Sequence, residues 1–249
     1  GATALGGSYA SGVDSFAAAI VNNTSSYGAT GNNSIAMGIQ AKASSARGVA
    51  IGGYATSSST SIALSTGWNN LAVTASGSNS VAIGGNTSAT SPGSFAFGQQ
   101  SSSAIRGKYA YASGRFAATG DSQGGQFILR ADTTDATATV LTTNNATAAA
   151  DNQIVAASDT CITFDGTIVA MQNGAQAYAS FKIEGLLVND GGTTTLANSA
   201  TTVIDNRSSW VMAMTADNTN NALAITVTGE ASHNIRWVAN IRTSEVTYT

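Results

Sequence analysis

Ser80-Val81-Ala82-Ile83-Gly84 is one copy of a five-residue phrase that recurs through the first 114 residues of the chain. Each copy runs from a small polar residue or Gly through an apolar residue, Ala and a second apolar residue, and it usually ends in Gly. Clear copies occupy residues 34–38, 48–52, 61–65, 80–84 and 94–98, and looser copies occupy 3–6, 15–18 and 108–112. Self-similarity at a fixed period is typical of stacked structural units, so this phrase decides the architecture.

The spacing of the central alanine defines the repeat. Successive copies place it at positions 4, 17, 36, 50, 63, 82, 96 and 110, so most steps are 13 or 14 residues and two are 19. A step of 13 or 14 suits a short strand, a turn and a return segment. The two longer steps insert about five residues within 20–33 and 65–79, and each insertion carries an aromatic residue, Tyr27 or Trp68. The insertions are expected on one face of the stack.

Side chains alternate along a strand, so the residues that flank each Ala point one way and the Ala points the other. We expect the flanking apolar residues to fill one core and the alanines to face a second, tighter contact. The Gly after the phrase allows a turn with positive φ. Coils stacked at about 4.8 Å per layer form a thin rod that is too slight to stand alone, so three chains are expected to associate side by side.

Phrases of the type Ser80–Gly84, Ser34–Gly38, Gly48–Gly52 and Ser94–Gly98 resemble the head repeats of trimeric autotransporter adhesins. The resemblance covers roughly residues 1–114. It implies a left-handed parallel β-roll that assembles into a homotrimer. The chain departs from that family in its two 19-residue steps, and we expect no neck, coiled-coil stalk or membrane anchor in residues 115–249.

Charge places a domain boundary near Gly114. Residues 1–114 contain four basic residues and one acidic residue, whereas residues 115–249 contain six basic and twelve acidic residues. Only 9% of the chain is charged, against about 25% in a typical soluble domain. Neither an apolar run of about 18 residues nor a basic patch with interleaved aromatics occurs, so membrane insertion and nucleic-acid binding are not expected. The start at Gly1 suggests an excised C-terminal piece of a longer protein.

Longer runs with period-two alternation replace the phrase after Arg115. In residues 223–228 and 235–242 apolar and polar side chains alternate, which indicates antiparallel strands with one wet face. Turn-forming clusters at 189–192, 216–221 and 229–232 separate such runs. The predicted fold is therefore all-β, with a parallel β-roll or β-helix of about 14-residue repeats over 1–114 and an antiparallel, jelly-roll-like β-sandwich over 115–249.

The second half resembles the C-terminal tip domains of bacteriophage tail fibres. The residues that carry this resemblance are Gly107–Phe116, Gly124–Arg130, Phe181–Gly185 and Asn234–Ala239. It implies a virion protein and covers roughly residues 107–249. It says little about a ligand.

Catalytic chemistry has few candidate groups. His233 is the only histidine and lies in a turn-like stretch, which argues against Ser–His and Cys–His hydrolases. Cys161 stands alone in an apolar run and is expected to be a core thiol. A glycosidase needs only two carboxylates, but Asp14 is the sole acid in the repeats and the acids of the second half mostly fall in turns. We therefore expect no catalytic residue, no metal and no cofactor.

Exposed aromatic and amide groups in loops are the candidate contacts for a receptor. Trp68 lies beside Asn69 in an inserted loop and could stack on a sugar ring or pack against a neighbouring chain, and Tyr27 occupies the comparable loop. Turn residues of the second half complete the set. The predicted contacts are Tyr27, Trp68, Asn69, Asp190, Asp217, Asn218 and Asn220.

These observations predict the distal fragment of a homotrimeric phage tail fibre that adheres to a host cell. The expected partners are a surface polysaccharide or protein receptor and the upstream part of the fibre or baseplate, and the expected location is the virion. The main alternative is the head of a bacterial trimeric autotransporter adhesin on the cell surface. A purely structural fibre segment and a polysaccharide depolymerase are further alternatives.

Overall fold

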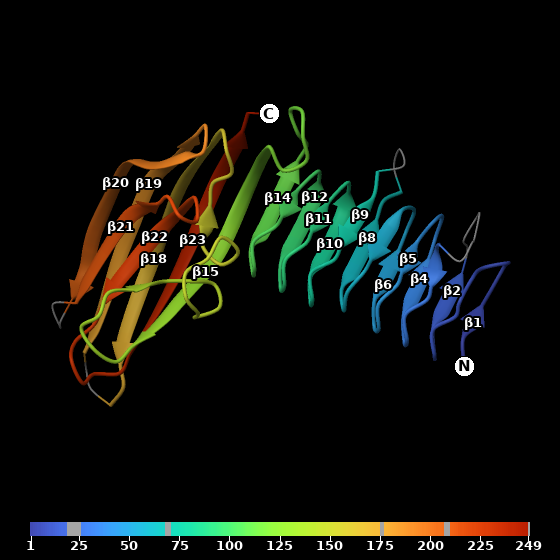
Figure 1. Cartoon of the computed structure of the whole chain (residues 1–249), viewed down its shortest axis with the longest axis horizontal. Coiled ribbons are helices and arrows are strands. Elements are labelled where there is room, and N and C mark those ends of the chain that lie inside the picture. Colours follow the sequence, from blue (N-terminus) through green and yellow to red (C-terminus); the bar gives the residue numbers. More distant parts are fainter. Residues whose placement is uncertain (19–25, 68–70, 175–176, 207–209, 249) are drawn as a thin grey trace. The chain divides into compact units, whose positions relative to one another are not determined.

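The computed structural model describes residues 1–18, 26–67, 71–174, 177–206 and 210–248 (Figure 1). The chain divides into two compact units, Gly1–Gln123 and Gly124–Thr249. The regular elements of the described residues are all β-strands, so the predicted all-β class is confirmed. No helix in these ranges is long and apolar enough to cross a membrane.

The first unit is a β-solenoid in which the coils from β2 to β13 each give one strand to each of two parallel sheets. In order, the strands of the first sheet are β1 (Thr3–Ala4), β2 (Phe16–Ala18), β4 (Ile35–Met37), β6 (Val49–Ile51), β8 (Ile62–Ser65), β10 (Val81–Gly85), β12 (Phe95–Gln99) and β14 (Tyr109–Ser113). Those of the second sheet are β3 (Gly28–Ala29), β5 (Lys42–Ala43), β7 (Ala55–Ser57), β9 (Val73–Ala75), β11 (Ser88–Ala89) and β13 (Ser102–Ser103). The predicted stack of coils is confirmed over residues 3–113.

The central alanines pair with one another in register along the first sheet. Ala36 pairs with Ala50, for example, and the pairing continues through Ala63 without a shift. Both 19-residue steps keep this register, because Ala17 pairs with Ala36 and Ala63 pairs with Ala82. The two longer steps therefore add residues without shifting the pairing of the sheet.

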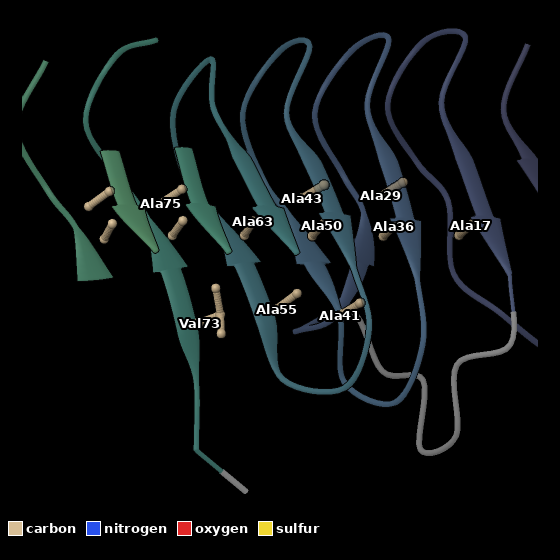
Figure 2. Packing of buried hydrophobic residues seen from close by; sticks show 13 residues of the cluster. Ala17, Ala29, Ala36, Ala41, Ala43, Ala50, Ala55, Ala63, Val73 and Ala75 are labelled. Atoms are coloured by element: carbon tan, nitrogen blue, oxygen red, sulfur yellow. The ribbon is translucent and has the colours of Figure 1, made fainter. Parts of the chain in front are cut away.

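The alanines line the interior of the coil, and this reverses the expected placement of the core. Ala36, Ala50 and Ala63 are 0% exposed and face the second-sheet alanines such as Ala29 and Ala43 (Figure 2). The larger flanking residues, expected to fill a core, point outward instead. The reason is that two strands so close together leave room for little more than a methyl group between them.

Residues with positive φ occur at two positions in the turns of the coils. Asn33, Arg47 and Asn79 have φ of 56°, 60° and 57°, and each stands two residues before the first apolar residue of its phrase. The glycine that ends the phrase also has positive φ, +131° at Gly84. A Cβ at Gly84 would collide with the carbonyl oxygen of Gly98 in the next coil, so this position excludes a side chain as well as favouring glycine.

The serine that opens the phrase ties the turn to the strand. Ser34 donates its hydroxyl to the Gly31 carbonyl at 2.6 Å, and Ser94 donates to the Ser91 carbonyl at 2.7 Å. Both serines are 0% exposed. A buried hydroxyl must find a partner, and here each serine hydroxyl finds one in a carbonyl of the preceding turn.

Asp121 organises the segment that follows β14. Its carboxylate accepts hydrogen bonds from the backbone N–H groups of Phe116, Ala117 and Ala118 at 3.0, 2.6 and 2.7 Å. Burial raises the pKa of Asp121, but the bonds from Ala118, Ala117 and Phe116 together lower it more, so the pKa lies below its ordinary value. The carboxylate thus replaces the missing backbone partners of this turn.

The second unit contains two antiparallel sheets. The first has the order β15 (Ser122–Thr133), β23 (Ile235–Thr247), β18 (Thr160–Gln172), β19 (Tyr178–Asp190) and β20 (Thr193–Asn206). The second consists of β16 (Thr139–Val140), β17 (Ile154–Val155), β21 (Val211–Asp217) and β22 (Ala222–Thr228), with β22 paired to the other three. The expected antiparallel strands are confirmed.

The strand order β23-β18-β19-β20 is that of a single Greek key. Three hairpin-connected strands are followed by a return strand that lies beside the first of them, and the return passes through the β21–β22 hairpin. A jelly roll combines two Greek keys in eight strands, so this unit has the simpler topology. The alternation of buried and exposed residues follows the expected period of two along β23.

Inward residues of both sheets form the core of the second unit. Trp237 of β23 is 0% exposed, its ring lies 5.5 Å from that of Trp210, and its Nε1 donates to Thr133 Oγ1 at 3.0 Å. Both tryptophans are core residues. Cys161 is not, because its side chain is on the exposed face of β18.

The close approach of neighbouring coils predicts a difference between two glycines. Gly84→Ala should lower the free energy of unfolding by about 4 kcal/mol or more, because the added methyl meets backbone. Gly93→Ala is the matched control, since Gly93 has φ +64° but open space around the Cβ position, and it should cost only about 1–2 kcal/mol. Urea unfolding measures both, and equal losses would contradict the packing described here.

The Asp121 carboxylate predicts a pH-dependent contribution to stability. A pKa lowered in the folded state means that the stabilisation is complete above the ordinary Asp value of about 3.9 and is lost as pH falls through the folded-state pKa. Asp121→Asn should therefore unfold at a lower temperature than the wild type at neutral pH, and the two curves should converge in acid. Melting temperatures between pH 7 and about pH 2 test this. A constant difference across that range would contradict it, and Asp190→Asn is the exposed control.

Candidate functional site

The outer side of the first sheet of the β-solenoid is apolar and open to solvent. We call it the outward apolar face. Eight of its large side chains are between 37% and 48% exposed. The face consists of Ile35, Met37, Val49, Ile51, Ile62, Leu64, Val81, Ile83, Phe95, Phe97, Tyr109 and Tyr111.

Strand register arranges this face in two continuous rows. Phe95 pairs with Tyr109, and Phe97 pairs with Tyr111, at the end where the aliphatic residues give way to aromatic ones. The rings of Phe97 and Tyr111 are stacked, with centroids 6.1 Å apart and planes 26° apart. Soluble proteins rarely expose a contiguous apolar surface of this kind unless it binds something.

The outer side of the second sheet is polar. Lys42, Thr56, Thr74, Ser88 and Ser102 stand in one register row along it. One side of the coil therefore presents hydroxyl groups while the other presents Ile, Met, Phe and Tyr side chains. This asymmetry makes the outward apolar face the candidate contact surface of the coil.

The sequence contains a signal for this arrangement that the alternation alone does not give. The central residue is Ala in all the phrases, whereas the flanking positions vary in size from Val49 to Tyr109. The narrow interior accepts small side chains, with Val73 the largest of its buried cluster, whereas an outer surface accepts many sizes. Size variation among the internal repeats therefore distinguishes the inner side from the outer side.

A shallow cleft of about 310 Å³ lies beside the second inserted loop. It is lined by Thr66, Leu71, Gly84, Gly85, Gly98, Gln99 and Gln100. Trp68 and Asn69, two predicted receptor contacts, lie outside the described residues. Tyr27 is described, is half-buried and directly precedes β3.

The turn residues predicted from the second half lie close to one another. The turn before β20 and the turn after β21 are linked because Thr194 N donates to Asn218 Oδ1 at 2.8 Å. Asp217 accepts bonds from Thr219 N at 3.0 Å and from Asn220 Nδ2 at 2.7 Å. The side chains of Asp217, Asn218 and Asn220 thus hold the turns together.

Asp190 and Asp217 differ in their surroundings. Asp190 ends β19 and is exposed. Burial raises the pKa of Asp217, but hydrogen bonds from the Asn220 side chain, the Asn220 backbone and the Thr219 backbone lower it more, so its pKa lies below the ordinary value. Within the residues that the structure describes, no three His, Cys, Asp or Glu side chains are grouped as metal ligands would be.

A second cleft, of about 510 Å³, occurs in the second unit at the ends of β15, β18 and β23. No residue that lines it was among the predicted contacts. The reason is that its residues are far apart in the sequence: the ion pair on its wall joins Asp132 to Arg236, with Oδ1 and Nε 3.2 Å apart. Only the sheet order β15-β23-β18 brings them together.

Comparison with known proteins supports the repeat assignment. Residues 29–55 and 75–101 match the YadA head domain repeat, and YadA head domains are trimeric. No curated protein matches the chain. A crystal structure of the tailspike protein gp49 from Acinetobacter baumannii bacteriophage Fri1, a capsular polysaccharide depolymerase, is distantly similar, with a TM-score of 0.29 and 9% sequence identity. The alignment covers 92% of this chain but only 36% of that tailspike, so this chain spans little more than a third of its length.

Proposed function

We propose that this chain is part of a homotrimeric phage tail fibre that adheres to the surface of a host cell and carries out no catalysis. The observation that carries the proposal is the outward apolar face on YadA-like head repeats. The trimer would bury that face around its axis. The protein would then work outside the cell, as part of a virion.

The energetics favour assembly through this face. Burying one methyl group, all that an interior Ala offers, is worth about 0.8 kcal/mol, whereas fully burying an Ile, Leu or Phe is worth about 1.5–3 kcal/mol. The larger apolar groups of each coil lie outside it, and eight of the twelve side chains of the outward apolar face are between 37% and 48% exposed in the single chain. More apolar surface is therefore available for burial between chains than within each coil.

Trimerisation also suits adhesion. Three copies of a weak site on one rigid body bind a repetitive surface with an avidity well above the affinity of one site. The predicted contacts Tyr27, Trp68, Asn69, Asp190, Asp217, Asn218 and Asn220 would supply such sites. Binding through three linked sites would suit either a polysaccharide receptor or a protein receptor.

The YadA repeat match favours one second candidate, the head of a bacterial surface adhesin. It uses the same β-solenoid and the same mode of association, so the two candidates differ in the rest of the molecule. Sequencing the gene beyond these residues distinguishes them. A coiled-coil stalk followed by a membrane anchor would replace the phage assignment with the adhesin.

A charge on the outward apolar face should prevent assembly. The wild type is expected to sediment at three times the chain mass of 24.8 kDa, and Ile62→Asp is expected to sediment as a monomer. The physical reason is that a carboxylate at a buried interface loses its hydration without gaining a partner, which costs several kcal/mol per chain. Analytical ultracentrifugation measures the masses.

Thr74→Asp is the matched control, because Thr74 lies on the polar outer side of the second sheet. It should remain trimeric, and circular dichroism should show the same strand content for both variants. A monomeric wild type, or an Ile62→Asp variant that remains trimeric, would contradict assembly through this face.

Adhesion predicts that the fluorescently labelled chain binds intact bacterial cells of a susceptible strain. Trp68→Ala should weaken that binding about tenfold or more if its indole stacks on the receptor, since three sites lose the contact at once. Thr56→Ala, on the polar outer side of the solenoid, is the control and should bind like the wild type. Flow cytometry across a strain panel gives the apparent affinity.

Two results would overturn the proposal. Absence of binding to every strain and to extracted envelope polysaccharide would leave a structural fibre segment as the better account. Release of reducing sugar from that polysaccharide would show catalysis and would favour a depolymerase.

A further inference from the structure

The cleft of the second unit has the dimensions of a small-ligand site. Its volume of about 510 Å³ falls within the range of about 300–1,000 Å³ that ligand pockets occupy. It lies where the end of β15 and the start of β23 meet the turn after β18, strands that are neighbours in one sheet (Figure 1). The lining consists of Asp132, Thr133, Thr134, Met171, Gln172, Asn173, Gly174, Asn234, Ile235 and Arg236.

The walls of this cleft are fixed by hydrogen bonds. Asn173 N donates to the Asn234 carbonyl at 2.9 Å, which joins the turn after β18 to the start of β23. On the opposite side, Asp132 and Asn145 are bonded twice, because Asp132 N donates to Asn145 Oδ1 at 3.1 Å and Asn145 Nδ2 donates to Asp132 Oδ2 at 2.8 Å. The backbone of a site held in this way loses little conformational freedom when a ligand binds.

Rigid aromatic packing supports the base of the cleft. Thr133, which lines it, accepts the Trp237 Nε1 hydrogen at 3.0 Å, and Trp237 is itself 0% exposed against Trp210. The neighbouring lining residue Ile235 is 1% exposed. The position of the polar wall is therefore tied to the core of the unit.

Several polar groups of the cleft have no partner within the described parts of the chain. They are the side-chain amides of Gln172, Asn173 and Asn234 and the hydroxyl of Thr134, for none of which a hydrogen bond is found there. Arg236 contacts Asp132 through Nε only, so the two terminal nitrogens of its guanidinium also point to no described acceptor. The cleft thus offers several donors and acceptors that are unpaired among the described residues, most of them exposed to solvent, on a backbone held by hydrogen bonds.

Apolar surface adjoins these polar groups. Met171 lines the cleft and is 66% exposed. Val169 lies two residues earlier on the same face of β18 and pairs with Val238 of β23, and both are exposed. A ligand with hydroxyl groups on one edge and C–H groups on one face would match this combination.

The charge of the cleft selects among such ligands. Asp132 and Arg236 neutralise each other, and the remaining polar lining is uncharged. One paired guanidinium is a poor site for a phosphate or polyanion, and residues 115–249 carry twelve acids against six bases.

We propose that this cleft binds an uncharged saccharide, with Arg236, Asn173 and Asn234 bonding its hydroxyl groups and Met171 contacting its C–H face. This inference rests on the proposed adhesive function and locates one receptor site.

The test measures retention of the full chain on immobilised neutral oligosaccharides of glucose, galactose and mannose, and on oligosaccharides that contain uronic acid. At least one neutral probe should bind the wild type. Arg236→Gln and Asn234→Ala should each weaken that binding about tenfold or more. The reason is that each substitution removes one hydrogen bond to the ligand, and a bond with a charged or well-placed partner is worth about that much. Tryptophan fluorescence verifies that Trp237 keeps its environment in both variants.

Arg242→Gln is the matched control. Arg242 stands on the same face of β23 and pairs with Asp165 in the same way, but it lies outside the cleft. It should bind like the wild type. Failure of every neutral probe, retention of uronic acid probes alone, or equal binding by Arg236→Gln and Arg242→Gln would overturn the inference.

Whole-cell binding separates this inference from the function on which it rests. If cells bind the wild type and Arg236→Gln equally, adhesion is still supported, but the cleft is excluded as the receptor site. Oligosaccharide binding by a protein that no cell retains would support the cleft and contradict adhesion.

Discussion

The narrow interior of each coil is the constraint on which the first unit depends. Two strands that stack at every turn leave space for the methyl groups of Ala36, Ala50 and Ala63, and these residues are fully buried. Larger side chains on the same strands have no room inside and must point away. The phrase that stacks the coils therefore also builds an apolar outer surface. The same five residues therefore direct the folding of one chain and expose the surface through which we propose that it associates with others.

This coupling explains why the polar groups of the solenoid are placed as they are. Buried serines such as Ser34 satisfy turn carbonyls, and left-handed residues such as Asn33 reverse the chain, so the coil closes without a large core. The second sheet keeps Thr56 and Thr74 on its outer side and stays compatible with water. The outward apolar face, in contrast, exposes large apolar side chains to solvent in the single chain. Contact with other copies of the chain would cover them.

The sequence predicted the register of the solenoid because the alanine spacing repeats along one chain. It did not predict which side of the strand is inside, since an alternating pattern has the same period on both sides.

In the second unit, alternation predicted that residues such as Trp237 lie in the core. It could not predict the strand order, because antiparallel strands of similar length and composition fit several partners. The cleft depends on that order: Asp132 and Arg236 meet only because β23 returns beside β15. Cys161 shows the same limit, since its apolar neighbours concealed that it faces solvent.

Association through the outward apolar face is the central claim, and thiol protection tests it most directly. A single cysteine is placed at Ile51→Cys in a Cys161→Ser background, with Thr56→Cys on the polar side as the reference. Ile51 is 38% exposed in the single chain, so its replacement thiol would react readily unless another chain covers it. The account predicts that the thiol at 51 reacts with maleimide much more slowly than the thiol at 56 when the protein is concentrated, and that dilution below assembly removes the difference. Similar reaction rates at every concentration would contradict it.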